Sequence, residues 1–544
     1  MPRGSRTMEG YGHSVSSSPY VVDPRNITQG TSYEATASQG SNASVPPTEE
    51  DHPDLYIPEE VKQFLPYFYK QIKNKVVPEI LNIYENEFNR LSDRYFKEFP
   101  WPEAKRIAPF VNNDEIFLIL FEELRYRHIY AKHKPTIEHR FESFQRYCDF
   151  FDAILNTDKP VDIELPNQWL WDIVDEFIYQ FQSFVQFRGK LTSRSADEIK
   201  MLKDDSKVWN IHGVLNVLYS LVEKSNINKQ LEAFMAGNDP DSVAGNFGTH
   251  LLYKNLGYFS LIGLLRLHCQ LGDYHAALSS VENLQLSKKV LATTRVPASQ
   301  IALYYYLGFS YFMTRKYRDT VRVFSNIIVF IQRVKQHFQP KSYQLDLVVK
   351  QNDQMLYILA MVLTLYPQHV DEAVNTQLKD RRFQEDMSKL QDGDAATFKK
   401  LFTQCCPKFI SPVAPDYDAL PDNYNYKAPT EHQCSLFMRD LEPQLILPVI
   451  RSYLKFYTTM PVAKLASFLE KDEAALCELL LRFKHRQRTS TLVGQMASDA
   501  QAASDIDFYI DGDMIHIADT KVARRYGDYF LRQINKLQDL VSKN

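Results

Sequence analysis

The stretch SDIDFYIDGDMIHIADTKVARRYGDYFL, residues 504–531, decides the fold near the end of this 544-residue chain. Apolar and polar residues alternate on both sides of an Asp-Gly pair at 511–512, with Ile506, Phe508 and Ile510 before the pair and Ile515 and Ile517 after it. Alternation with a period of two is typical of a half-buried strand, and Asp-Gly is a favoured turn of a tight hairpin. The stretch therefore predicts a β-hairpin that runs into a charged amphipathic helix.

Three helical segments precede the hairpin: LILPVIRSYLKFYTT, TTMPVAKLASFLE and EAALCELLLRFKHRQ, within residues 445–487. In the second segment we expect Thr459 to cap the helix and Pro461 to lie in its first turn, because proline needs no amide partner there. Asp472 is the expected cap of the third segment. Three helices and a hairpin in this order predict a winged helix.

The middle of the chain contains a repeat of helical hairpins. LLRLHCQLGDYHAALSSVENL and GFSYFMTRKYRDTVRVFSNII share a helix, a short turn, a tyrosine and a second helix, with Tyr274 and Tyr317 in matching positions. Such units stack on their neighbours because none of them buries its apolar face alone. The pattern predicts a tetratricopeptide-like array in which three glycines let helices approach closely: Gly257, Gly263 and Gly308.

Earlier in the chain, LPNQWLWDIVDEFIYQFQSF (165–184) is apolar around most of a helical circumference. A helix with so little polar surface is buried on two sides. The pattern leaves two interpretations open. The segment is either a central core helix or a helix that docks a partner through Trp169, Trp171, Phe177 and Phe181.

Composition narrows the class of protein. A formal net charge of -4 gives no overall basic excess of the kind found in nucleic-acid-binding proteins. Six scattered Cys without a CxxC pair argue against a zinc ribbon and fit a reducing compartment. No leader-like segment and no apolar run long enough for a membrane span are present. We expect a cytosolic or nuclear protein without membrane contact, and of these two compartments we favour the cytoplasm. Residues 1–52 are rich in Ser, Thr, Pro and Gly, so we expect them to form a disordered tail.

The sequence also lacks the motifs of common catalytic sites. It has no phosphate-binding loop, dinucleotide fingerprint, HExxH or GxSxG motif. The 14 His are scattered and form no ligand-like pair with an acid nearby. We therefore expect no enzymatic activity, no cofactor and no metal.

A winged helix often reads DNA with its third helix, which raises the question of nucleic-acid binding. Here that helix ends in a basic segment whose cations are candidates for a weak, salt-sensitive contact with ribosomal RNA: Arg482, Lys484, Arg486 and Arg488. The middle of the helix is rich in Ala and Leu, which suits packing rather than base readout. An RNA contact and a plain solvated helix end both remain open.

The helix expected after the hairpin carries one apolar stripe: Val522, Tyr526, Phe530, Ile534, Leu537 and Val541. This stripe either folds back on the winged helix or joins helices of other chains in a bundle. We favour the bundle, because the helix is long and follows a complete small domain.

Helical hairpins that run into a winged helix and a C-terminal helix resemble a PCI module, which occurs in the proteasome lid, the signalosome and translation initiation factor 3. Individual segments of the sequence show a more specific similarity than this order of elements does. LPNQWLWDIVDEFIYQFQSF, YTTMPVAKLASFL and DMIHIADTKVARRYGD are similar to the subunit L family of eukaryotic translation initiation factor 3. The similarity covers residues 55–540, and nothing is carried onto the first 52 residues.

The resemblance implies a non-catalytic scaffold subunit of a complex that binds the small ribosomal subunit and supports recruitment of initiator tRNA and mRNA. It implies that the hairpin, through Ile506, Phe508, Ile510, Ile515 and Ile517, forms an interface with other winged helices. The last helix would join a shared bundle, and subunits K and E would be neighbours. The alternative is a PCI scaffold subunit of the proteasome lid or the signalosome.

Together these patterns predict an all-α fold: a right-handed, tetratricopeptide-like helical-repeat array that ends in a winged helix with a small β-hairpin and a C-terminal helix. The expected plan is a disordered tail (1–52), an N-terminal helical domain (53–250), the helical repeats of the PCI module (251–440), the winged helix (441–519) and the bundle helix (520–544).

Overall fold

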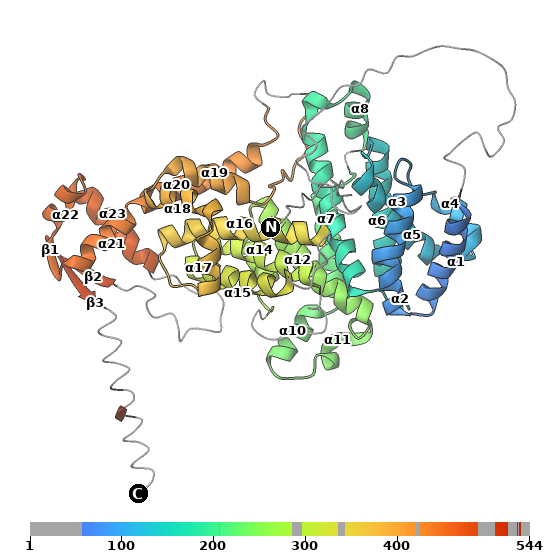
Figure 1. The fold of residues 1–544 in the computed structure, drawn as a ribbon, viewed down its shortest axis with the longest axis horizontal. Coiled ribbons are helices and arrows are strands. Elements are labelled where there is room, and N and C mark those ends of the chain that lie inside the picture. The colour runs from blue at the N-terminus through green and yellow to red at the C-terminus, as the bar shows by residue number, and fades with distance from the viewer. Residues whose placement is uncertain are drawn as a thin grey trace, which may run out of the picture. The chain divides into compact units, whose positions relative to one another are not determined.

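The computed structural model describes residues 57–205, 207–284, 296–335, 343–418, 424–487 and 506–519, together with residues 530, 533 and 534. Contacts divide the chain into two compact units: unit 1 (1–306, 330–352 and 409–426) and unit 2 (307–329, 353–408 and 427–544). Within the described residues, helices make up the fold apart from one three-stranded sheet (Figure 1). The prediction of an all-α chain with a small hairpin near its C-terminus is confirmed.

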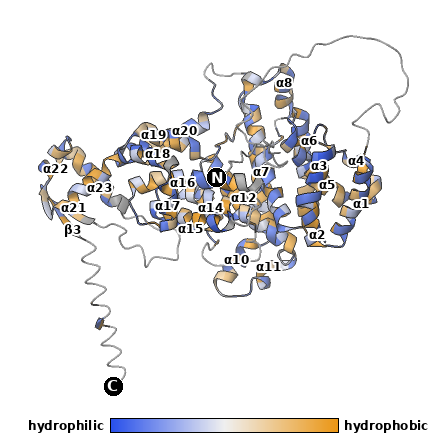
Figure 2. Ribbon diagram, in the orientation of Figure 1, coloured by the Kyte–Doolittle hydropathy of each residue, from blue (hydrophilic) through white to orange (hydrophobic). Residues whose placement is uncertain are grey.

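Unit 1 consists of helices joined by short connections. Up to residue 284 they are α1 Glu59–Lys73, α2 Val77–Asn82, the π-helical η3 Ile83–Glu87, α3 Phe88–Tyr95, α4 Ala104–Ile107, the 3₁₀ turn η4 Ala108–Val111, α5 Glu115–Lys132, α6 Ile137–Leu155, α7 Asn167–Gly189, the 3₁₀ turn η5 Leu191–Ser193, α8 Ala196–Asp204, α9 Ile211–Lys224, α10 Ile227–Met235, α11 Asp241–Gly248, α12 Leu251–Leu271 and α13 Tyr274–Ser280. Helix α12 packs against α7, α9 and α13, and α5 packs against α6. Figure 2 shows hydrophobic and hydrophilic residues mixed along these helices, as expected of amphipathic segments.

Helix α7 lies in the core of unit 1. Trp169, Trp171, Phe177 and Phe181, the four residues considered above for docking, are all buried. The ring of Trp169 stacks on Tyr84 with centroids 5.2 Å apart and on Phe68 with centroids 5.9 Å apart. Burial of all four side chains is what the core-helix interpretation expects.

A buried polar network joins α7 to its neighbours. Arg127 and Glu123 of α5 form an ion pair with both side chains buried. The indole N–H of Trp169 donates to Oε2 of Glu123 over 3.1 Å, and the hydroxyl of Tyr84 donates to Oδ2 of Asp172 over 2.5 Å. Charges removed from water in this way are tolerated because each has a partner.

Glu176 of α7 is a buried acid without such a close cation. Gln180 donates a hydrogen bond to its Oε1 over 3.0 Å. Burial, which disfavours the charged form, raises the pKa of Glu176 to about 8, although Arg127 opposes the shift. The side chain is therefore protonated in the folded chain at neutral pH.

The helical hairpin repeat is present where the sequence predicted it. Helix α14 Pro297–Met313 is followed by α15 Tyr317–Lys335, so the two matched tyrosines, Tyr274 and Tyr317, each begin the second helix of a hairpin. The remaining helices before the winged helix are α16 Tyr343–Leu365, α17 Glu372–Leu378, α18 Arg381–Gln391, α19 Ala395–Cys405 and α20 Ala428–Leu445. Helix α19 packs against α18 and α20.

Glycines permit the closest helix approaches, as expected. A Cβ at Gly308 would lie 2.3 Å from Cε1 of Phe324, and a Cβ at Gly257 would lie 2.0 Å from Oγ of Ser225. At Gly263 the nearest atom, Cδ1 of Ile178, would be 2.9 Å away. These distances are shorter than real Cβ contacts, so a larger residue forces the helices apart or shifts a buried side chain.

Gly308→Ala should lower the free energy of unfolding by about 1–3 kcal/mol, because the buried ring of Phe324 has to move. Chemical denaturation followed by circular dichroism measures the change. Gly213→Ala in α9 is the control, because nothing lies within 4 Å of a Cβ there. Equal effects of the two substitutions would contradict the close-approach explanation.

Glu176→Gln should remove part of the pH dependence of stability. The folded pKa is raised, so the unfolded chain releases this proton near pH 4.5 while the folded chain retains it up to about pH 8. The free energy of unfolding therefore falls as pH rises through this window. Because Gln has no proton to release, the Glu176→Gln variant should have a free energy of unfolding higher by up to about 3 kcal/mol at pH 7. Thermal unfolding between pH 5 and pH 8.5 tests this, with the exposed Glu164→Gln as control; an unchanged pH profile in Glu176→Gln would contradict it.

Candidate functional site

The winged helix of unit 2 is the candidate site, and a three-stranded sheet organises it. Its strands are β1 Thr459–Pro461, β2 Ile506–Asp511 and β3 Met514–Asp519, in the antiparallel order β1-β3-β2. Its helices are α21 Leu447–Phe456, α22 Val462–Phe468 and α23 Glu473–Gln487. Figure 1 shows these helices and strands grouped together.

The first strand corrects the expectation for Thr459. Instead of capping a helix, Thr459 pairs with His516, and Met460 pairs with Ile515. Pro461 ends the strand and is the N-cap residue of α22. The amide of Val462 donates to the carbonyl of Asp513 over 2.8 Å, which ties the start of α22 to the hairpin turn.

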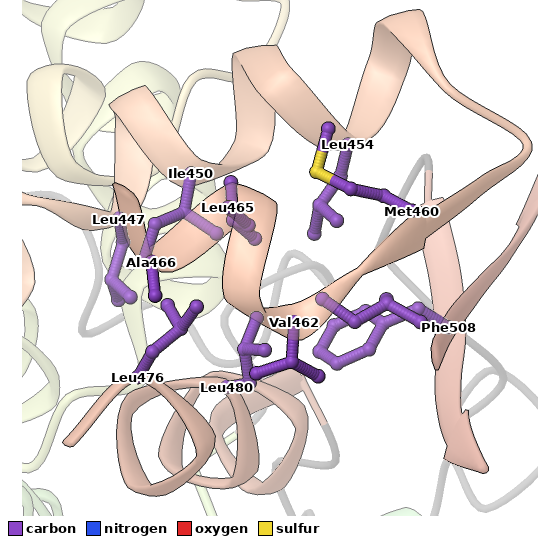
Figure 3. Packing of buried hydrophobic residues seen from close by; sticks show 11 residues of the cluster. Leu447, Ile450, Leu454, Met460, Val462, Leu465, Ala466, Leu476, Leu480 and Phe508 are labelled. Carbon is purple, nitrogen blue, oxygen red and sulfur yellow. The ribbon is translucent and has the colours of Figure 1, made fainter. Parts of the chain in front are cut away.

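One apolar cluster holds the helices and the sheet together (Figure 3). It contains Leu447, Ile450 and Leu454 of α21, Met460 of β1, Val462, Leu465 and Ala466 of α22, Leu476 and Leu480 of α23, Phe508 of β2 and Ile515 of β3. In Figure 3 the labelled side chains point toward one another from every element of the domain except β3, whose Ile515 belongs to the same cluster. The domain therefore has its own core.

The cluster decides where the predicted interface residues lie. Phe508 and Ile515 are buried inside it, and Ile510 and Ile517 are partly buried and packed against it. The side chain of Ile506 lies outside the described residues. The apolar face of the hairpin thus forms part of the core of this domain.

The outer face of the sheet is polar and aromatic. Tyr509 of β2, 57% exposed, stacks on His516 of β3 with ring centroids 4.9 Å apart, and His516 is paired in turn with Thr459. Among the residues that the structure describes, β2 pairs with β3 alone, so its other side is an edge there. An edge strand presents backbone groups that can pair with a strand of another chain.

The basic end of α23 has mainly internal contacts. Lys484 donates a hydrogen bond to the carbonyl of Phe508, and its ammonium lies 5.6 Å from the centre of the Phe508 ring. Arg482 forms an ion pair with Glu478 one turn earlier. The side chain of Arg486 and all of Arg488 lie outside the described residues. Lys484 therefore fastens β2 to α23.

Little of the predicted bundle helix is described. Phe530 and Ile534 are both exposed, whereas Val522, Tyr526, Leu537 and Val541 lie outside the described residues, as does the N-terminal tail.

Within the described residues, no three His, Cys, Asp or Glu side chains are grouped so that they could hold a metal ion. None of the helices in the same part of the chain has the length and apolar character needed to cross a membrane.

Comparison with known proteins decides the family. A family model described as RNA polymerase I-associated factor PAF67 matches residues 139–537. A protein of Nematostella vectensis named eukaryotic translation initiation factor 3 subunit L is 55% identical, with 89% of this chain and 92% of the relative covered. A protein of the same name from Danio rerio is 50% identical, with 90% of this chain and 89% of the relative covered. A third protein of this name, from Homo sapiens, is also 50% identical, with 89% of this chain and 90% of the relative covered.

The chain belongs to the subunit L family of eukaryotic translation initiation factor 3. The resemblance seen in the sequence is thereby confirmed. Members of the subunit L family carry the name of an initiation factor subunit, and the winged helix described above lies within the matched region.

Phe508→Ala should destabilise the winged helix by about 3–5 kcal/mol, because it empties a place in the apolar cluster. Tyr509→Ala, one residue later on the outer face, should change stability by at most about 0.5 kcal/mol. Amide hydrogen exchange of residues 506–519 in the full chain measures both. Loss of protection in Tyr509→Ala, or full protection in Phe508→Ala, would show that the hairpin faces the other way.

Proposed function

We propose that this chain is a non-catalytic assembly subunit of translation initiation factor 3. The observation that carries the proposal is an identity of 50–55% with proteins named subunit L, over about nine tenths of both chains. The small, self-contained winged helix with a strand edge adds a physical reason, because it offers a means of joining other subunits.

The proposed attachment is edge pairing through β2. This strand has six residues, twice as many as β1, so it offers the longer edge of the sheet. A partner strand laid along it gains main-chain hydrogen bonds, and exposed side chains beside the edge give specificity. Tyr509 is the exposed aromatic residue on this strand, and aromatic residues commonly contribute strongly to binding at interfaces. In this arrangement, the buried side chains of Phe508 and Ile515 hold the strands of the interface in place from the core side.

The segment after the hairpin is the second proposed attachment. Phe530 and Ile534 are exposed and four residues apart, as two neighbours on one face of a helix are. We propose that the stripe from Val522 to Val541 joins a bundle with helices of other subunits. Packing this apolar stripe against apolar faces of other helices would remove it from water, which is favourable.

Partners and location follow from the proposed complex. Subunits K and E are the proposed neighbours, and the assembled factor would support recruitment of the small ribosomal subunit, initiator tRNA and mRNA in the cytoplasm. Because Arg482 and Lys484 are engaged in internal contacts, any RNA contact of this segment is proposed to be weak or indirect. The domain plan (1–52, 53–250, 251–440, 441–519 and 520–544) stays a prediction.

The test is quantitative mass spectrometry of proteins that co-purify with the tagged full chain, the Tyr509→Asp variant and a chain that ends at residue 440. Initiation factor 3 subunits should co-purify with the full chain, fall several-fold with Tyr509→Asp and be lost from the truncation. Tyr67→Asp, which changes an exposed tyrosine of unit 1, is the control and should retain them.

Three outcomes would contradict the proposal in different ways. Proteasome-lid or signalosome subunits in place of initiation factor subunits would exclude the proposed complex. Partners that remain after truncation would place the attachment before residue 440. A loss with the truncation but not with Tyr509→Asp would move the attachment away from the β2 edge.

A further inference from the structure

Helix α21 has a second apolar face, of which only Tyr453 packs against the winged-helix core. Figure 3 shows Ile450 and Leu454 pointing from α21 into the apolar cluster. Val449, Tyr453 and Phe456 are spaced by four and three residues, so they share a different face of the helix. Phe456 is 82% exposed and Val449 is also exposed, whereas Tyr453 is partly buried.

Phe468 of α22 and Tyr457, which follows α21, extend this face. The ring of Phe468 stacks on Tyr453, with centroids 5.5 Å apart and an angle of 22° between the planes. The ammonium of Lys464 lies 5.5 Å from the centre of the Tyr457 ring and 5.8 Å from that of Phe468. We call this the aromatic surface, made of Val449, Tyr453, Phe456, Tyr457, Lys464 and Phe468. A contiguous, exposed group of this kind is typical of an interaction site rather than of scattered surface residues.

The stretch of chain that carries the aromatic surface is basic. From residue 443 to residue 469 the sequence contains Arg451, Lys455 and Lys464 and no Asp or Glu. The flanking acids, Glu442 and Glu470, lie beyond the two ends of α21 and α22. The elements that carry the surface are therefore positively charged, and they favour a negatively charged occupant.

This sign argues against the chain's own C-terminal segment as the occupant. Residues 520–544 carry an apolar stripe that would suit an apolar surface, but they contain six Lys or Arg and only two Asp. Two positively charged partners repel each other, most strongly at low ionic strength. The fold-back of the last helix onto this surface is thus electrostatically unfavourable.

We propose that the aromatic surface of α21 and α22 docks an acidic amphipathic helix of a neighbouring subunit. The stripe from Val449 to Phe456 spans two helical turns, about 10 Å, which suits ridges of a second helix packed along it. Acidic side chains on the flanks of that helix would face Lys455 and Lys464. The inference deepens the proposed function, since it gives the chemistry of one partner, and it uses a face different from the β2 edge.

The first test is binding of a fluorescein-labelled synthetic peptide to the purified full chain, followed by fluorescence anisotropy. The peptide has Leu and Phe at helical spacing and Glu on both flanks. Phe456→Ser and Lys464→Glu should each weaken binding at least about tenfold, as loss of a central contact does. Phe99→Ser, at an exposed phenylalanine of unit 1, should leave binding unchanged. Unchanged circular dichroism of each variant shows that the fold is retained.

Matched probes separate the alternatives. The same peptide with Lys in place of Glu should bind at least about tenfold more weakly, with the difference reduced by salt. Equal binding of the two peptides, failure of the acidic peptide to bind, or preferential binding of oligo(U) RNA that is lost in Phe456→Ser would overturn the proposal. Stronger peptide binding after removal of residues 520–544 would also overturn it, because the chain itself would then cover the surface.

The second test is a photo-crosslinking amino acid at position 456 of the tagged full chain in cells, with the attached segment mapped by mass spectrometry. A helical segment with net negative charge and an apolar stripe supports the proposal; a basic segment, RNA or residues 520–544 overturns it. The peptide tests need no assembled complex, so their failure is distinct from failure of the co-purification test, which reports on the complex itself.

Discussion

The winged helix depends on burial of one face of a two-stranded hairpin against three short helices. Phe508 and Ile515 contribute to this contact from the hairpin, and Met460 contributes from a strand only three residues long. Side chains alternate along a strand, so a register shift of one residue would turn these apolar groups to water. The same constraint fixes which side chains face outward and which strand forms the long edge of the sheet. Packing of the core therefore determines which residues are exposed at the candidate attachment surfaces, the outer face of the sheet and its β2 edge.

Much of this region could be predicted from local patterns. The alternation of apolar residues on both sides of Asp511-Gly512 corresponds to β2 and β3, and Gly512 has the positive φ, 54°, that suits such a turn. The matched tyrosines of the repeat also mark the starts of α13 and α15. In both cases the signal is periodic or lies in a short motif, so neighbouring residues in the sequence contain it.

Other features depended on contacts between distant residues. Strand β1 has too few residues for a period to be visible, and its existence follows from pairing with β3, more than fifty residues later. The four aromatic residues of α7 could belong to a core or to a docking face, because periodicity reports that a surface is apolar but not what covers it. Rings of Phe68 and Tyr84, from α1 and η3, cover Trp169. The hydrogen bond from Lys484 to the carbonyl of Phe508 likewise joins residues 24 positions apart, so the sequence around Lys484 does not indicate it.

The unequal edges of the sheet give the domain a polarity. Strand β2 has six residues and β1 has three, and β3 lies between them. A strand from a neighbour would find six residues to pair with along β2 and only three along β1. Strand pairing with another chain would therefore favour one side of the domain over the other.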